Sequence, residues 1–251
     1  MASIDRLYKY GRLGSHSEAL FSGSQIWLAP PAQLNDPFEC RPWFTYQGTE
    51  EEIFEVIVTG FRKKNPRATH EQALVAATEI HQQRRHLAPG FWESLSAEVI
   101  RDLGSRIGLY CLAEAPDSVL MWSHYGRDHK GYCLAFEATN YTVVFGEAQK
   151  VRYSDTYPQV DFFKTPNQEQ IEPIFLTKYL GWAYEREWRI VGYQTGPGLR
   201  EYPPELLKTV IFGLRMPDAD KEQIREWVAR REHPVNFLPR RAERSPVLHR
   251  D

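Results

Sequence analysis

The chain has 251 residues, 42% of them hydrophobic and 25% charged, which is the composition of an ordinary soluble globular protein with a substantial core. A formal net charge of -2 gives no electrostatic case for broad binding to nucleic acid or membranes. Three cysteines without a CxxC spacing argue against a disulfide framework and a cysteine zinc site. The N-terminus lacks the apolar region of a secretory signal, and no apolar run approaches membrane-spanning length. We therefore expect a cytoplasmic protein that does not bind membranes.

The N-terminal region predicts two short strands. Residues 7–10 and 25–29 are rich in aromatic and β-branched residues, and a short helix is predicted between them over 17–21. Pro30 and Pro31 end the second strand, because proline cannot donate to a sheet ladder.

The next segment, residues 34–39 (LNDPFE), predicts a tight turn, because Asn and Asp side chains bond nearby backbone groups. Two interpretations stay open for it. In one, the turn is structural and Phe38 packs on the core. In the other, the loop carries Asn35 and Asp36 beside a pocket.

Residues 49–104 predict a helical insertion. Thr49 and Thr69 are each followed three residues later by Glu or Gln, which is the signature of a capping box at a helix start. Apolar residues then recur at helical spacing, and a third helix is predicted over 91–103.

No metal site is predicted. His70, His81 and His86 lie in the helical insertion without a partner at metal-ligand spacing, so we interpret them as residues of solvated helix faces. His124 and His129 are separated by a polar loop, which is a poor spacing for two ligands on one helix face. P-loop, Rossmann, GxSxG and HExxH motifs are missing as well.

The remainder of the chain alternates short strands and loops. Strands are predicted at residues 107–112, 131–137, 149–153, 207–214, 234–238 and 246–249. A loop is predicted over 154–170 and an amphipathic helix over 218–231. The fold class expected is α+β, with a mixed and mostly antiparallel sheet core and an inserted helical segment, in a single domain of residues 1–251.

An aromatic cluster stands before the glycine-bounded loop at residues 126–131. Trp122, His124 and Tyr125 follow one another there after a short helical turn. Such a cluster is found both as the wall of a binding cleft and as plain core packing, and the sequence favours neither.

Residues 178–191 (KYLGWAYEREWRIV) carry the strongest chemical signal. If they form a strand, Glu185, Glu187 and Arg189 share one face, since side chains two apart point to the same side. The surrounding aromatic residues predict burial, where ionised groups are costly unless they are paired. These charges therefore either pair with one another or act on a ligand.

Four motifs in order resemble one bacterial family. They are LYKY at 7–10, LNDPFE at 34–39, LMWSHYG at 120–126 and WAYEREWR at 182–189. The family they resemble is a domain of unknown function (number twenty-nine seventy-one), which implies no activity.

A second resemblance does imply an activity. Glu185-Arg-Glu187 is similar to the Glu-x-Glu strand of ADP-ribosyltransferases, enzymes that consume NAD. That resemblance implies that Glu187 holds the nicotinamide ribose and supports an oxocarbenium-like transition state, with Glu185 on the acceptor side. It makes NAD a substrate and assigns Lys9 to the polar position of the first strand. The candidate NAD-binding residues are Tyr8, Lys9, Tyr10, Asn35, Asp36, Trp122, His124, Tyr125 and Arg189.

Three hypotheses follow. The first is an NAD-consuming transferase or glycohydrolase, in bacterial stress or phage defence, whose acceptor the sequence does not specify. The second is a non-enzymatic module that senses a ligand or a partner. The third is a nucleic-acid enzyme, motivated by Arg230, Arg231, Arg240, Arg241 and Arg244, although such a run is more often a solvated tail.

Overall fold

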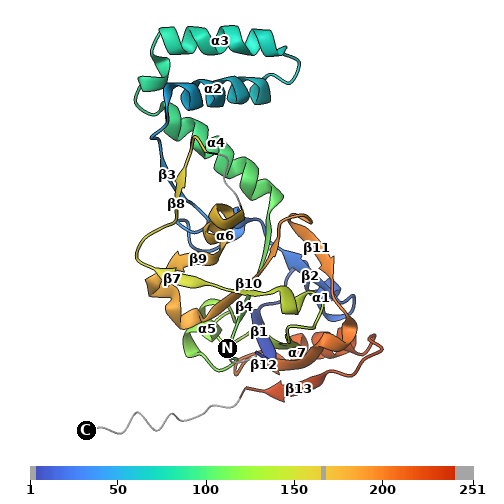
Figure 1. The fold of residues 1–251 in the computed structure, drawn as a ribbon. Coiled ribbons are helices and arrows are strands. Elements are labelled where there is room, and N and C mark those ends of the chain that lie inside the picture. The colour runs from blue at the N-terminus through green and yellow to red at the C-terminus, as the bar shows by residue number, and fades with distance from the viewer. Residues whose placement is uncertain (1–3, 165–167, 241–251) are drawn as a thin grey trace, which may run out of the picture.

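A seven-stranded sheet forms the centre of the fold in the computed structural model, which describes residues 4–164 and 168–240 (Figure 1). The strand order is β13-β12-β5-β1-β4-β10-β6, and neighbouring strands are antiparallel except for the parallel pair β12–β13. Its strands are β1 (Arg6–Gly11), β4 (Gly108–Ala113), β5 (Tyr132–Glu137), β6 (Gln149–Lys150), β10 (Glu187–Gly192), β12 (Leu207–Phe212) and β13 (Asn236–Pro239). With several helices around this sheet, the α+β class is confirmed, including its mixed and mostly antiparallel sheet.

Three small ladders accompany the main sheet. The first pairs β2 (Gln25–Leu28) with β11 (Gly198–Glu201), and these strands are antiparallel. The parallel ladders pair β3 (Trp43–Thr45) with β8 (Gln159–Asp161), and β7 (Arg152–Ser154) with β9 (Thr177–Tyr179).

Side-chain alternation divides the main sheet into two different faces. One face carries the principal hydrophobic cluster, which includes Leu134 and Phe136 of β5 and Ile190 of β10. Because successive strand residues point to opposite sides, Glu187 and Arg189 project from the other face of β10. The sheet therefore presents a charged pair on the side away from its main core.

Three α-helices pack close to the sheet or its small ladders, and a fourth precedes β9. They are α1 (Ser17–Phe21), α5 (Val119–His124), α7 (Asp218–Val228) and α6 (Gln168–Leu176). Among the described residues, no helix combines the length and apolar character needed to cross a membrane.

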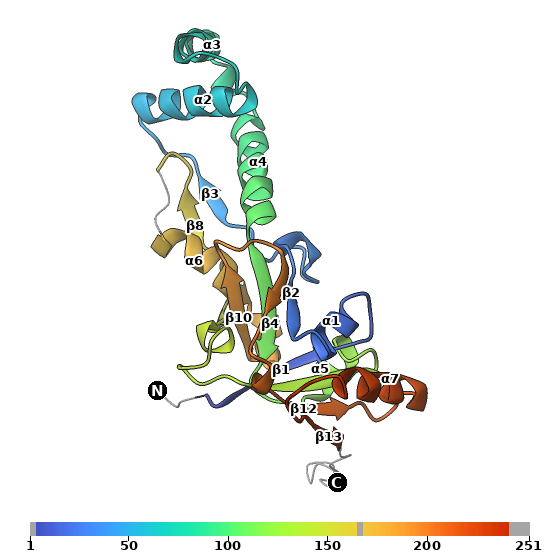
Figure 2. The ribbon, with the colours of Figure 1, turned by 90° about the vertical axis from the view of Figure 1, so that its right-hand side faces the viewer.

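The remaining helices form an arm that projects from the sheet (Figures 1 and 2). Both views place α2 and α3 at its far end, with α4 running back to the start of β4. The arm comprises α2 (Glu50–Lys64), α3 (His70–Gln82), the 3-10 segment η2 (Arg85–Leu87) and α4 (Phe91–Arg106). The capping boxes at Thr49 and Thr69 are both confirmed, since each side chain accepts from the backbone three residues on.

Two interpretations of side chains on the arm and the turn are wrong. His86 does not lie on a solvated face: it is 4% exposed, and its ring stacks on that of His81 with centroids 4.8 Å apart. Phe38 does not anchor the turn on the core, since 66% of it is exposed. The turn is held instead by Asp36, whose Oδ1 accepts from the Phe38 backbone N–H at 2.9 Å.

Other differences concern the later elements. The single strand predicted over 149–153 is two short strands, β6 and β7, interrupted at Val151, whose N–H bonds the carbonyl of Glu187. The loop predicted over 154–170 contains β8 and the start of α6. The strand predicted at 246–249 lies outside the described residues.

Candidate functional site

The segment from β9 to β10 does not form one continuous strand. Lys178 lies on β9, and the chain then forms the 3-10 helix η4 (Leu180–Glu185) and passes through Arg186 in a left-handed conformation, φ 47°. The prediction that Glu185 shares a strand face with Glu187 is therefore wrong in its geometry. The two carboxylates meet through Lys178 instead, whose Nζ lies 2.5 Å from Glu185 Oε2 and 3.1 Å from Glu187 Oε2.

Arg189 completes the pairing of Glu187. Its Nε and Nη2 donate to the two carboxylate oxygens of Glu187 at 2.7 and 2.9 Å, its Nη2 contacts Glu39, and its Nη1 donates to the Phe175 carbonyl at 2.7 Å. We define the buried ionic cluster as Glu39, Lys178, Glu185, Glu187 and Arg189, each of which is 5% exposed or less. Three carboxylates facing two cations leave a formal charge of -1 when all are ionised.

The two central carboxylates have opposite pKa displacements. Burial opposes ionisation of Glu187, but the charge and hydrogen bonds of Arg189 and the charge of Lys178 outweigh it and lower the pKa of Glu187 to about 2. For Glu185, burial dominates and raises the pKa, although Lys178 and a 2.5 Å hydrogen bond from the Tyr125 hydroxyl oppose it. Glu187 is thus held ionised, while Glu185 is the member of the pair that exchanges a proton most readily.

A cavity of about 580 Å³ opens beside this cluster. Most of the residues expected to bind a ligand line it, together with Glu39 and Lys178 of the cluster. The predicted residues in its wall are Tyr8, Lys9, Tyr10, Asn35, His124, Tyr125, Glu185 and Glu187.

Three predicted site residues, Asp36, Trp122 and Arg189, do not line this cavity. Trp122 is completely buried, packs edge-on against Tyr10 and donates its indole N–H to the Pro116 carbonyl at 2.8 Å, so it cannot stack on a ligand. Asp36 holds the turn described above. Arg189 is completely buried behind Glu187, where the guanidinium is occupied by protein acceptors.

Sequence reasoning missed Glu39 and Lys178. Glu39 lies in the turn at residues 34–39 and Lys178 in the segment 178–191. Neither pattern indicates that the two residues meet, because they are 139 positions apart. Their Glu39 Oε1 and Lys178 Nζ atoms are 3.5 Å apart. Glu39 Oε2 and the Tyr110 hydroxyl are buried without a hydrogen-bond partner among the described residues, and both residues line the cavity. Unpaired buried polar atoms at a cavity favour a polar ligand.

The cationic run near the C-terminal end is not simply a solvated tail. Arg230 pairs with Glu18, Arg231 donates to the Phe21 carbonyl at 3.1 Å, and Arg240 contacts His129. These guanidinium groups have partners within the chain, so fewer of them support the hypothesis of a nucleic-acid site. Arg241 and Arg244 lie outside the described residues.

Residues 121–190 match the model of a family described as "Protein of unknown function (DUF2971)". Over these 70 of the 251 residues, the match supports the family that the sequence resembles. The DUF2971 region includes the WSHYG and WAYEREWR motifs, Tyr125 and both central glutamates, whereas LYKY and LNDPFE lie outside it. No curated protein and no solved structure matches the chain significantly.

Proposed function

We propose that this chain is an NAD-consuming enzyme of the ADP-ribosyltransferase or NAD glycohydrolase type. The observation that carries the proposal is that Glu185 and Glu187 line one cavity while their pKa values are displaced in opposite directions. Two carboxyl groups whose environments separate their pKa values are the usual basis for dividing electrostatic and proton-transfer roles.

Glu187 supplies the fixed negative charge. Cleavage of the nicotinamide–ribose bond develops positive charge at the anomeric carbon, and an oriented carboxylate lowers the energy of that state. Arg189 and Lys178 hold the Glu187 carboxylate in one orientation and keep it ionised. The buried ionic cluster has one more carboxylate than cations, so its net formal charge is negative when Glu185 is ionised.

Glu185 acts as the general base. It accepts hydrogen bonds from Tyr125 and Lys178, which orient its carboxylate in the cavity wall. In its ionised form it removes a proton from the incoming nucleophile, which is water in a glycohydrolase and an acceptor hydroxyl or amine in a transferase. The raised pKa of Glu185 makes it a better base than an ordinary carboxylate at neutral pH.

The rest of the cavity suits a dinucleotide. Its volume of about 580 Å³ is in the range of small-molecule sites. Tyr8 offers aromatic surface for a base, and Arg12 and Arg127 offer guanidinium groups for the pyrophosphate.

Incubation of the purified full chain with NAD tests this proposal. We expect calorimetric binding of NAD, a higher melting temperature in its presence, and release of free nicotinamide measured by chromatography. Glu187→Gln should abolish release, while Arg186→Met, on the exposed residue between the two glutamates, should release nicotinamide at the wild-type rate. Binding of NAD without release of nicotinamide would support the ligand-sensing alternative instead. The absence of both NAD binding and nicotinamide release would overturn the proposal.

A further inference from the structure

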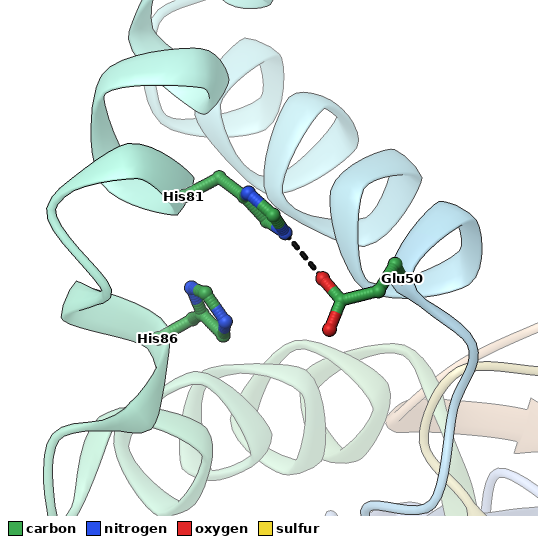
Figure 3. Close-up of side chains that lie close together, drawn as sticks. All are labelled: Glu50, His81 and His86. Carbon is green, nitrogen blue, oxygen red and sulfur yellow. Dashed lines mark hydrogen bonds and ion pairs between the residues drawn. The ribbon is translucent and has the colours of Figure 1, made fainter.

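Three side chains from different elements of the helical arm converge on one space, and none of them lines the cavity described above (Figure 3). Glu50 is the first residue of α2, His81 lies in the last turn of α3, and His86 lies in η2. One ligand-type atom from each residue lies within 4.8 Å of the others. Three elements of the arm therefore bring two imidazoles and a carboxylate together.

The hydrogen bonding within this group is incomplete. His81 Nε2 lies 2.5 Å from Glu50 Oε2, and the rings of His81 and His86 stack nearly parallel, with 12° between their planes. These contacts account for Glu50 and His81 as a structural pair. They leave His86 Nδ1, which is buried and has no hydrogen-bond partner among the described residues. A buried polar nitrogen without a partner is costly to the fold, so the hydrogen bonds of the described residues do not account for the burial of His86.

We propose that Glu50, His81 and His86 bind a divalent transition-metal ion of the zinc class. Two imidazole nitrogens and one carboxylate oxygen are a donor set that zinc accepts, whereas Mg²⁺ and Ca²⁺ prefer oxygen ligands alone. Three protein ligands leave a fourth position for water, which reaches the site because Glu50 is largely exposed. The metal would join α2, α3 and η2 at a single point.

Binding requires only a small local movement. Ligand atoms about 2.1 Å from a tetrahedral zinc ion lie about 3.4 Å from one another, so the direct Glu50–His81 hydrogen bond is exchanged for two bonds to the metal. The Glu50 side chain is 76% exposed and rotates without disturbing the core. The spacing rules applied to the sequence do not detect this site, because Glu50 and His81 are 31 positions apart.

Zinc titration of the full chain, after removal of metal by a chelator, tests the proposal. Calorimetry should give one zinc per chain, and Co²⁺ should give the visible absorption of a four-coordinate site. Glu50→Gln, His81→Gln and His86→Gln should each weaken zinc binding at least about tenfold, since even outer-shell changes cost that much. His70→Gln, on an exposed histidine of the same helix α3, is the matched control and should bind zinc like the wild type.

A second readout guards against misfolded variants. Zinc should raise the melting temperature of the wild type and of His70→Gln but not that of Glu50→Gln. Because the Glu50 side chain is exposed, Glu50→Gln should fold like the wild type, which circular dichroism would verify. Mg²⁺ at the same concentration should raise none of them. Absence of stoichiometric zinc binding, or equal binding by the wild type and a folded His81→Gln/His86→Gln double variant, would overturn the proposal.

Discussion

Arg189 donates two hydrogen bonds to the carboxylate of Glu187, which stands two positions earlier on the same face of β10. Glu187 pairs with Arg189 and also lines the cavity, whereas Arg189 is buried behind it and does not line the cavity. The arginine therefore fixes the ionised state and orientation of Glu187 without closing access to it.

Replacing Arg189 should strongly destabilise the fold. Arg189→Met removes the main counter-charge of Glu187 and Glu39, and breaking a buried pair from one side costs about 3–5 kcal/mol. Arg186→Met breaks only a pair with Glu114 whose arginine side chain is 63% exposed, and should cost less than about 1 kcal/mol. Urea unfolding of both variants measures the difference, and equal losses would show that the buried pair has no special weight.

Glu187 should also give the fold a dependence on acid pH. Its pKa is about 2 in the folded chain and near 4.5 when unfolded, so the unfolded state binds more protons between these values. The free energy of unfolding then falls as pH drops from about 4.5 to about 2, by on the order of 3 kcal/mol. Glu185 acts in the opposite sense, because its raised pKa makes ionisation unfavourable to the fold as pH rises above its ordinary value.

Unfolding measured across that pH window in the wild type and in Glu187→Gln isolates the contribution of this carboxyl. The variant should lose less stability on acidification, since the other carboxyls are common to both proteins. Parallel curves for the two would contradict the assignment of a depressed pKa to Glu187.

Tyr125→Phe should change the pH dependence of nicotinamide release. The Tyr125 hydroxyl donates to ionised Glu185 and so lowers its pKa, against the larger effect of burial. Without that donor the pKa of Glu185 rises further, and the acid limb of the pH–rate profile moves to higher pH. At pH values well above that limb the rate should stay close to that of the wild type. An unmoved acid limb would count against Glu185 as the base.

Two glycines should respond oppositely to alanine. A Cβ built at Gly131 lies 2.1 Å from the Gly11 carbonyl oxygen, a backbone atom that cannot move aside, so Gly131→Ala should cost about 1–3 kcal/mol. Gly104 is inside helix α4 with no atom near its Cβ position, so Gly104→Ala should stabilise by about 0.5–1 kcal/mol. Thermal unfolding of both variants checks the sign of each change.

Elements with a local signal could be predicted from the sequence. Thr49 and Thr69 each carry a complete capping box within four residues, and the helices begin there. The sequence located the aromatic cluster of the DUF2971 region but did not show which residue is core and which lines a cavity. That difference between Trp122 and Tyr125 depends on the distant residues that pack against each of them. Trp122 became core, and Tyr125 became part of the cavity wall.

Features that depend on distant contacts could not be predicted. The 3-10 helix ending at Glu185 precedes a left-handed Arg186, a conformation for which glycine would have been the usual signal. Glu39 joins the site because the turn after β2 packs against β10, a pairing that no local pattern expresses. The convergence of His86 with Glu50 could not be predicted either, because it also depends on a contact between distant parts of the chain.

The most direct test of the central claim is nicotinamide release from saturating NAD by Glu185→Gln. This variant keeps the size and shape of the side chain and one of its two accepting oxygens, which still bonds Tyr125 or Lys178, but it cannot accept the proton. We expect kcat to fall by about 10²–10⁴-fold while NAD binding changes only a few fold. Release by Glu185→Gln at the wild-type rate, or a wild-type chain that binds no NAD and releases no nicotinamide, would contradict it.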